Sequence, residues 1–387
     1  MHILQVIDGL GPSGGAERSL ASLAPQYVAY GVTLDVAYLF PRTGLRAQLE
    51  DAGATLFSLS GRGGILGSAW RLRRLLSERR VDIVHTTLFN SDIAGRIAAG
   101  LSSTPVVCTL ASAAYGPEQL MHPAVRPWKL RMVQAIDSAT ARSVRRFHAV
   151  TEHVGDEMSA RLHIPRDRIE VIPRGRDPLA LGLRTPDRRA AARDRLGIRP
   201  EHRVVLMAAR HEYQKGTDLL VQGFPLILRA APDAVAVVAG REGTLTPQLR
   251  RTISELGLEK QVRLLGSRED VPDLMCAADV FVVPSRWEGI AGVLIEAMAL
   301  EVPIVASDIP PVREVLGDVG AGRLVGSDDP TALAAGVLSM LGARQEAAVS
   351  VRRARERFLA NYTTEVVAKR MMAFYETALG RQGRVAA

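Results

Sequence analysis

Two glutamates in the C-terminal third of the chain are spaced so that both could contact one ligand. Glu288 follows the apolar run Val280–Pro284. Seven residues separate it from Glu296, which lies in a segment of helical spacing. A helix that begins near residue 292 leaves its first backbone N–H groups without intrahelical partners, and such groups bind anions. We expect the turn before this helix to face an anionic ligand; the alternative is a capping carboxylate and a surface glutamate. The turn consists of Gly289, Ile290, Ala291 and Gly292.

Two cations precede a second predicted helix. Arg210 and Lys215 lie five positions apart in the segment ARHEYQKG, directly after the apolar run RVVLMAA and before Thr217. Two positive side chains on a loop at the end of a strand suit a diphosphate, because charge-assisted hydrogen bonds to phosphate are strong. A basic loop that only contacts solvent is the alternative for this pair.

A glycine-rich segment follows the first strand-like run. In DGLGPSGGAERSL the glycines at 9, 11, 14 and 15 allow a sharp turn and a close approach of the backbone to a ligand. The spacing does not match the dinucleotide-binding fingerprint. We expect Gly14 and Gly15 to lie near a bound phosphate at the start of the next helix, and the alternative is a tight turn without a ligand.

These residues follow strand-like runs in a regular series. Short apolar runs alternate with amphipathic segments, and such alternation predicts parallel sheets covered by helices. The series pauses at the proline-containing stretch Ile172–Pro186 and restarts at residue 203. We predict an α/β protein with two Rossmann-like domains facing across a cleft, where strand-end loops carry the ligand site. The predicted parts are an N-terminal domain at 1–180, a second domain at 181–364 and a C-terminal helix at 365–387 that packs back on the N-terminal domain.

Length and composition exclude several classes of protein. The chain has 387 residues, 47% of them hydrophobic, and two cysteines that lie far apart. A disulfide-rich secreted module is therefore excluded, and no spacing predicts a zinc or iron–sulfur site. No apolar stretch reaches the length that crosses a bilayer. The opening MHILQVIDGL has no basic n-region, and we expect a cytoplasmic location.

The excess of positive charge is concentrated in one part of the chain. The net charge is +8, and residues 51–150 contain 13 Lys and Arg against 6 Asp and Glu. The segments Trp70–Arg80 and Pro127–Arg146 have the pattern of basic amphipathic helices, which predicts peripheral contact with the inner face of an anionic membrane. The alternative is a solvated helix face. Nucleic acid is not expected as a partner, since interleaved aromatics and a recognition motif are missing.

Five segments in order resemble one enzyme family. They are GGAER at 14–18, VIPRGRD at 171–177, ARHEYQKG at 209–216, LGSREDVPDLMCAADVFVVPSRWEG at 265–289 and EAMALEVPIVASD at 296–308. Together they make the chain similar, over its whole length, to the retaining glycosyltransferases of family four with the GT-B fold. Any one segment alone would not be specific.

The resemblance implies that the domain at 1–180 binds the acceptor and that the domain at 181–364 binds the nucleotide-sugar donor. It also implies roles for the matching residues. Arg210 and Lys215 match the pair that neutralises the donor diphosphate, and the glycine loop matches one near the diphosphate and the acceptor. Glu288 matches a carboxylate beside the hydroxyls of the donor sugar, and the turn after it matches one at the sugar and phosphate. Glu296 matches the carboxylate that binds the ribose. We expect Arg210, Lys215 and Glu288 to be the catalytic set.

Several positions depart from the family's pattern. Where the family often has a histidine at the end of the fifth strand, this chain has Ala111, and where it often has an asparagine in the linker motif, this chain has Arg174. His85, Tyr115 and Glu118 are candidates for acceptor contacts; the alternatives are a structural histidine and a surface loop without a role.

The predicted function is that of a retaining hexosyltransferase. It would move a sugar from a nucleoside-diphosphate donor, with UDP-sugar favoured over GDP-mannose, to a hydroxyl acceptor in surface-glycan, glycolipid or natural-product synthesis. The acceptor would be a glycan, a lipid-linked molecule or a small molecule. We expect no cofactor and no metal, because no Asp-x-Asp cluster follows a strand and the cations can stabilise the leaving group. The alternative is a non-catalytic GT-B partner or scaffold subunit.

Overall fold

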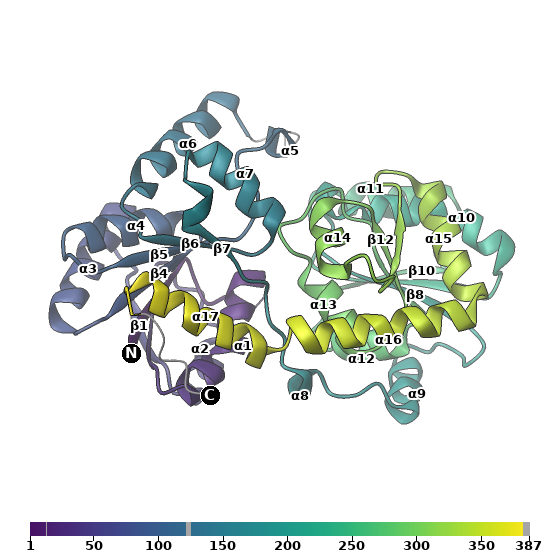
Figure 1. The fold of residues 1–387 in the computed structure, drawn as a ribbon. Coiled ribbons are helices and arrows are strands. Elements are labelled where there is room, and N and C mark those ends of the chain that lie inside the picture. Colours follow the sequence, from purple (N-terminus) through teal and green to yellow (C-terminus); the bar gives the residue numbers. More distant parts are fainter. Residues whose placement is uncertain (13, 121–124, 382–387) are drawn as a thin grey trace. The chain divides into compact units, whose positions relative to one another are not determined.

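The computed structural model describes residues 1–12, 14–120 and 125–381 of the chain. The chain divides into two compact units (Figure 1). Unit 1 contains Met1–Asp177 and Tyr362–Ala387, and unit 2 contains Pro178–Asn361. These boundaries lie three residues before the 180/181 and 364/365 divisions expected from the sequence.

Unit 1 is built on a seven-stranded sheet in which every neighbouring pair is parallel. The strand order is β3-β2-β1-β4-β5-β6-β7, so the direction of winding reverses between β1 and β4. A ligand in such a sheet binds outside the carboxyl ends of the strands at this reversal. The strands are β1 (His2–Ile7), β2 (Thr33–Tyr38), β3 (Thr55–Ser58), β4 (Ile83–Thr87), β5 (Val106–Leu110), β6 (Arg146–Ala149) and β7 (Ile169–Val171).

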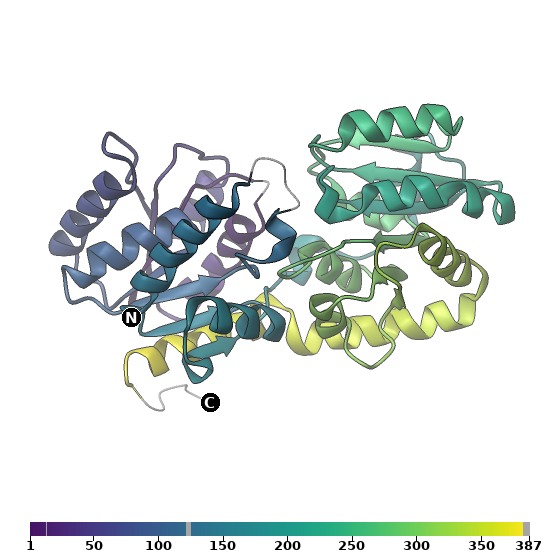
Figure 2. The ribbon, with the colours of Figure 1, turned by 90° about the horizontal axis from the view of Figure 1, so that it is seen from above.

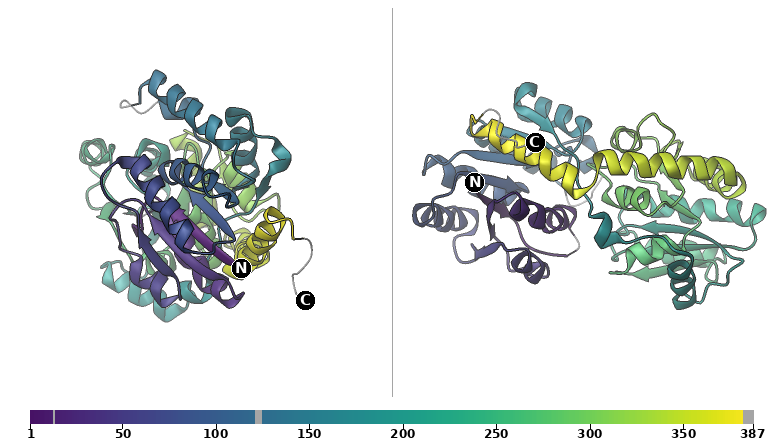
Figure 3. Two further views of the ribbon diagram at one scale, coloured as in Figure 1. Left: turned by 90° about the vertical axis from the view of Figure 1, so that its left-hand side faces the viewer. Right: turned by 60° about the horizontal axis from the view of Figure 1, so that its bottom comes forward.

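Helices flank this sheet, and one of them comes from the far end of the chain (Figures 1 and 3). The α-helices of unit 1 are α1 (Gly15–Ala29), α2 (Arg46–Asp51), α3 (Gly64–Glu78), α4 (Phe89–Gly100), α5 (Pro117–Leu120), α6 (Pro127–Ala141), α7 (Glu152–Leu162) and α17 (Thr364–Ala378). One core cluster joins Ile3, Ile7 and Leu34 of the sheet to Leu20 of α1 and Phe374 of α17. Helix α17 is therefore part of the core of unit 1, and residues 382–387 of the predicted C-terminal helix lie outside the described residues.

Unit 2 repeats the same winding with six strands. The order is β10-β9-β8-β11-β12-β13, all pairs are parallel, and the winding reverses between β8 and β11. The carboxyl ends of β8 and β11 carry the segments ARHEYQKG and SRWEG. The strands are β8 (Arg203–Ala208), β9 (Ala234–Ala239), β10 (Val262–Gly266), β11 (Val280–Val283), β12 (Ile304–Ser307) and β13 (Arg323–Val325).

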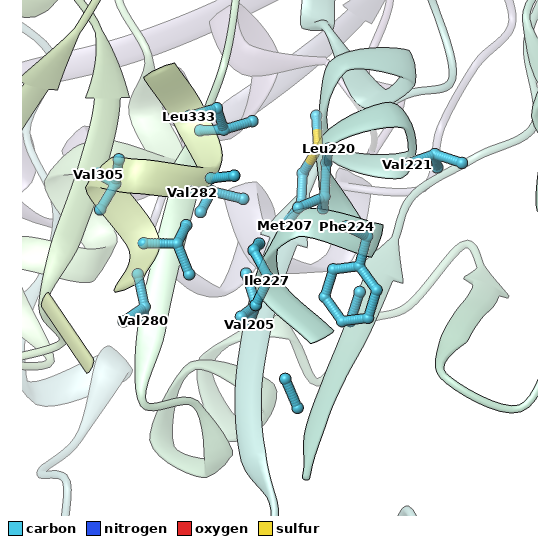
Figure 4. Packing of buried hydrophobic residues seen from close by; sticks show 14 of the residues in the cluster. Val205, Met207, Leu220, Val221, Phe224, Ile227, Val280, Val282, Val305 and Leu333 are labelled. Carbon is cyan, nitrogen blue, oxygen red and sulfur yellow. The ribbon is translucent and has the colours of Figure 1, made fainter. Parts of the chain in front are cut away.

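Strands β9 and β11 of unit 2 are fully buried, and their side chains are apolar on both faces, as the inner strands of a parallel sheet require. In Figure 4, Val205 and Val282 of the sheet pack with Phe224 and Ile227 of α10 and Leu333 of α15. Figure 2 shows helices and strands of this unit in a second view. Its α-helices are α8 (Pro178–Leu181), α9 (Pro186–Arg195), α10 (Thr217–Ala230), α11 (Thr246–Glu255), α12 (Val271–Ala277), α13 (Gly292–Ala299), α14 (Pro310–Leu316), α15 (Pro330–Gly342) and α16 (Arg344–Asn361).

The α/β class and the two Rossmann-like units are confirmed. Helices α10 and α13 begin at Thr217 and Gly292, where the sequence predicts them. The stretch Ile172–Pro186, at which the alternating series pauses, contains the short helix α8. Four residues make this single turn, which is too short to show a helical period in the sequence.

Candidate active site

The carboxyl ends of β8 and β11 bring Lys215 and Glu288 into direct contact. Lys215 Nζ donates to Glu288 Oε1 at 2.5 Å, and the hydroxyl of Ser285 donates to the same oxygen at 2.8 Å. The carboxylate is almost fully buried, whereas one fifth of the lysine side chain remains exposed. In the described part of the chain, both hydrogen bonds to this carboxylate end on Oε1, so Oε2 can accept from a ligand hydroxyl.

Arg210 follows the same strand as Lys215 and is exposed. Among the residues that the structure describes, its guanidinium has no hydrogen bond or ion pair, so its charge is available to a ligand. The next residue, His211, anchors this loop: it is buried, and Nδ1 lies 3.0 Å from Thr246 Oγ1. Burial lowers the pKa of His211, which keeps the side chain neutral beside the two cations.

The turn after Glu288 leads into helix α13. Ile290 and Ala291 are buried, and the N-cap residue Ala291 provides no side-chain hydrogen bond to the helix. The first N–H groups of α13 therefore lack a side-chain cap and can meet an anion. Glu296 is 3% exposed in the second turn of the same helix. The carboxylates of Glu288 and Glu296 thus belong to one loop–helix segment.

Gly216 allows the lysine-bearing loop to approach β11. Its φ is +69°, and a Cβ at this position would lie 2.0 Å from the carbonyl oxygen of Pro284. A side chain would therefore be strained by both the backbone conformation and the contact. This close approach brings Lys215 to Glu288, and sequence reasoning had assigned Gly216 no role.

In unit 1 the glycine loop contacts charged side chains. Gly14 is the N-cap of α1, and the carboxylate of Glu17 lies against it, while a guanidinium nitrogen of Arg174 lies against Gly15. Burial raises the pKa of Glu17, although Arg174 and Arg42 oppose this effect. Arg174, the departure from the family's asparagine, therefore lies at the glycine loop.

His85 lies inside a chain of buried hydrogen bonds. Its Nε2 is 2.7 Å from Thr109 Oγ1, and its Nδ1 is 2.6 Å from the hydroxyl of Tyr375 in α17. Burial, with a smaller contribution from His148, lowers the pKa of His85 to about 3. Both ring nitrogens are thus occupied within the protein, which is the structural alternative, and a contact between His85 and the acceptor stays a prediction.

The loop after β5 holds the other acceptor candidates. The Tyr115 hydroxyl donates to Asp137 Oδ2 at 2.7 Å, and burial raises the pKa of this tyrosine. Glu118 belongs to α5 and is partly buried. Ala111 follows the last residue of β5, so no histidine stands at that strand end. Acceptor contacts of Tyr115 and Glu118 stay predictions.

Sequence reasoning missed residues in and around the loop after β8, which carries Lys215, and the loop after β11, which carries Glu288. Ser285 and Arg286 lie inside the motif SRWEG, where they were not assigned a role. The signal that could have found them is their position, because Ser285 and Arg286 are polar and come shortly after the fully buried strand β11. Asp218 was hidden in the first turn of α10, where an acidic residue is commonplace because it interacts favourably with the helix dipole.

Comparisons with known proteins identify the family to which the chain belongs. Residues 188–357 match the family described as Glycosyl transferases group 1, and residues 13–178 match that described as Glycosyltransferase Family 4. A relative from Rhizobium meliloti, lipopolysaccharide core biosynthesis mannosyltransferase LpsB, is 30% identical over 61% of this chain and 67% of its own length. The chain belongs to glycosyltransferase family 4.

Other relatives of this family 4 glycosyltransferase differ in their named activities. Phosphatidyl-myo-inositol mannosyltransferase of Mycolicibacterium smegmatis is 28% identical over 98% of this chain and 90% of that protein. Two further relatives, a D-inositol 3-phosphate glycosyltransferase and a galactosyltransferase of Escherichia coli, are matched over 57% and 60% of their lengths.

Solved structures show the same GT-B fold. HepE (Alr3699) of Anabaena in complex with UDP superimposes with a TM-score of 0.84 at 21% identity, over 97% of this chain and 100% of that chain. WaaG, a glycosyltransferase involved in lipopolysaccharide biosynthesis, gives a TM-score of 0.73 at 17% identity over 96% of this chain and 99% of that chain.

Two further properties of the described residues concern membrane-spanning helices and metal sites. In residues 1–12, 14–120 and 125–381, no helix combines the length and the hydrophobicity that crossing a bilayer requires. No group of three or more His, Cys, Asp or Glu in these ranges is placed to hold a metal ion. The expectations of a cytoplasmic location and of a reaction without metal or cofactor stay predictions.

Proposed function

We propose that this protein transfers a hexose from a nucleoside-diphosphate donor to a hydroxyl acceptor with retention of configuration. The observation that carries the proposal is the contact of Lys215 with Glu288 at the winding reversal of unit 2. There, a cation suited to phosphate and a carboxylate suited to hydroxyls lie side by side, as the junction of a sugar and a diphosphate demands. A scaffold subunit would not require this arrangement.

The charges support a route for the leaving group. When the bond between the sugar carbon and the phosphate oxygen breaks, the electron pair stays on the diphosphate. Arg210, Lys215 and the N-terminus of α13 are donors that are already in place for this charge, and such preorganised donors account for much of enzymatic rate enhancement. Glu288 would accept from sugar hydroxyls through Oε2, while Oε1 remains bound to Lys215 and Ser285.

The donor is proposed to be a UDP-sugar rather than GDP-mannose. HepE has been solved with UDP and with UDP-glucose, and its fold is the same. The names of the mannosyltransferase relatives favour the alternative donor. The acceptor is proposed to be a glycan or glycolipid, since relatives are named for lipopolysaccharide and for phosphatidyl-myo-inositol.

Calorimetry with UDP and GDP tests the donor site. Lys215→Ala and Glu296→Gln are each expected to weaken nucleotide binding about tenfold or more, because a charged partner is lost in each case. The exposed residues Lys260 and Glu255 provide the matched controls Lys260→Ala and Glu255→Gln, which should bind as the wild type does. Unchanged binding in the first two variants would refute the site. Hydrolysis of the donor sugar without acceptor separates an enzyme from a scaffold.

We further propose that α6 contacts an anionic membrane. Trp128, Met132 and Ile136 form an exposed stripe at helical spacing, with exposed fractions of 62%, 50% and 43%. Arg126, Lys129 and Arg131 are also exposed on or beside this helix. An apolar stripe bordered by cations suits the interface of a bilayer with anionic lipids.

Flotation with vesicles tests the membrane contact. Vesicles that contain phosphatidylglycerol should carry the protein, and recovery should fall as salt rises. Trp128→Ala should reduce recovery, whereas Leu256→Ala, which removes an exposed apolar side chain after α11 in unit 2, should not. No recovery with anionic vesicles, or equal loss in both variants, would count against α6 as the contact.

A further inference from the structure

Arg286 ties the two loops of the donor site together. Its Nη1 donates to the carbonyl oxygen of Tyr213 at 2.7 Å and to Asp218 Oδ1 at 2.9 Å, while Nη2 donates to Asp218 Oδ2 at 2.7 Å. Its Nε donates to Asp328 Oδ1 at 2.7 Å. The side chains of Arg286 and Asp218 are 9% and 11% exposed. We name this set of contacts, made by Arg286 to Asp218, Asp328 and the Tyr213 carbonyl, the Arg286 latch.

The backbone and a glutamine side chain reinforce the latch. The N–H group of Arg286 donates to the carbonyl oxygen of Gln214 at 2.8 Å, and Gln214 Nε2 donates to the carbonyl oxygen of Trp287 at 2.9 Å. The guanidinium carbon of Arg286 also lies 3.8 Å from the centre of the Tyr213 ring. Gln214, directly before Lys215, therefore accepts from Arg286 and donates to Trp287, the residue directly before Glu288.

The sheet alone does not hold these loops together. Strands β8 and β11 pair through only two residue positions, Val205 with Val280 and Leu206 with Phe281. The last two residues of each strand, which lead into the loops, are outside these pairs. The latch takes over this role, because its bonds join residues that lie 68 and 73 positions apart in the chain.

The charges show why Arg286 is not itself a ligand for phosphate. Burial alone would lower its pKa, but the carboxylates of Asp218 and Asp328 raise it, so the guanidinium is charged and already paired. Arg210, in contrast, is exposed and has no partner among the described residues. Arg286 therefore acts on the site through the loops that it joins.

We propose that Arg286 is a positioning residue that sets Lys215 against Glu288 and so tunes the affinity of the site for the diphosphate part of the donor. This inference rests on the proposed function. A shift of the lysine loop by a fraction of a hydrogen-bond length weakens a charge-assisted contact strongly, and small displacements of positioned groups can cost large factors in rate.

The test compares UDP with UMP in Arg286→Gln and Asp218→Asn. Both variants should lose about tenfold in affinity for UDP, in line with the loss of charge-assisted hydrogen bonds, and much less for UMP. Arg286→Lys should recover only part of the loss, because an ammonium cannot span the same fork of acceptors. The KM for the donor sugar should rise, and kcat should fall as well, because Lys215 also stabilises the charge that develops on the leaving group.

A matched control separates positioning from stability. Arg188 also ties distant segments of unit 2, since it donates to Asp273 and to the carbonyl oxygens of Leu181 and Leu183. Arg188→Gln should lower the melting temperature by a similar amount and leave the ratio of UDP to UMP affinity unchanged. An equal loss for UDP and UMP in Arg286→Gln would mean a structural role only and would overturn the proposal.

The outcome for Lys215→Ala distinguishes the two proposals. If this variant binds UDP as the wild type does, the donor site itself is wrong. If it weakens UDP binding while Arg286→Gln does not, the donor site stands and the latch is refuted. If both weaken UDP selectively over UMP, both proposals are supported.

Discussion

At the scale of single residues, a directed chain of hydrogen bonds crosses the core of unit 1. His148 Nε2 lies 2.6 Å from the carbonyl oxygen of Ile172 and must donate to it, so Nδ1 accepts from Thr109. Thr109 in turn accepts from His85 Nε2, which leaves His85 Nδ1 to accept from Tyr375. This assignment holds with both rings neutral, the form that burial favours by lowering the pKa of His85 and of His148.

Acid is expected to destabilise unit 1 through these histidines. Burial lowers the pKa of His85 to about 3 and that of His148 to about 4. Their stabilising contribution is complete above about pH 6.5, the ordinary pKa of histidine, and is lost as the pH falls towards the folded values. Each contributes a slope of about 1.4 kcal/mol per pH unit in that window. Burial raises the pKa of Asp92 to about 7, so Asp92 contributes a slope of opposite sign, which offsets the slope from one of the two histidines.

Thermal unfolding between pH 4 and 7.5 measures this effect. His148→Gln should lower stability at neutral pH and make the dependence of the melting temperature on pH shallower below pH 6.5. The exposed histidine at the end of α7 provides the control variant His163→Asn, which should keep the dependence of the wild type. Parallel curves for His148→Gln and wild type would contradict the assignment of a neutral buried histidine.

At the scale of elements, the loop between β8 and α10 depends on a glycine that touches another strand end. Gly216 is the N-cap of α10 and has a left-handed backbone. Gly257, after α11, has nearly the same φ of +65°, but a Cβ there would meet nothing within 4 Å. Substitutions at Gly216 and Gly257 can therefore be compared to separate the free-energy cost of backbone strain from that of a steric clash.

Gly216→Ala is expected to cost clearly more stability than Gly257→Ala. In Gly257→Ala the only cost is that of holding alanine in the left-handed conformation, about 1 kcal/mol. Gly216→Ala has the same cost and also forces its Cβ against the carbonyl of Pro284. Urea unfolding of both variants gives the two values, and UDP binding should weaken in Gly216→Ala alone. Equal costs and equal binding would show that the loop can move away from β11 without consequence.

At the scale of the whole molecule, the order of the chain makes one unit depend on the last helix. Unit 2 is continuous in sequence, but unit 1 takes α17 from the end of the chain into its core. Met371, Phe374 and Tyr375 of α17 are at most 1% exposed. Burying side chains of this size stabilises a core by roughly 2 kcal/mol each.

A chain that ends at Asn361 should therefore lose the unfolding transition of unit 1 and keep that of unit 2. Loss of α17 exposes the apolar face against which it packs, and removal of several large core side chains is comparable to the usual stability of a domain. A chain that ends at Arg381 keeps the helix and serves as control. Differential scanning calorimetry shows whether one transition vanishes; two intact transitions in the shorter chain would contradict the dependence.

The sequence by itself determined the class of fold and the order of the motifs, because both are local properties. Apolar runs and helical spacing predict strands and helices whatever their neighbours are, and Lys215, Glu288 and Glu296 carry their chemistry in their residue types. Only the tertiary structure decided which charges meet. Arg286 pairs with Asp218 across 68 positions because β8 and β11 are neighbours in the sheet, and periodicity along a chain does not encode strand order.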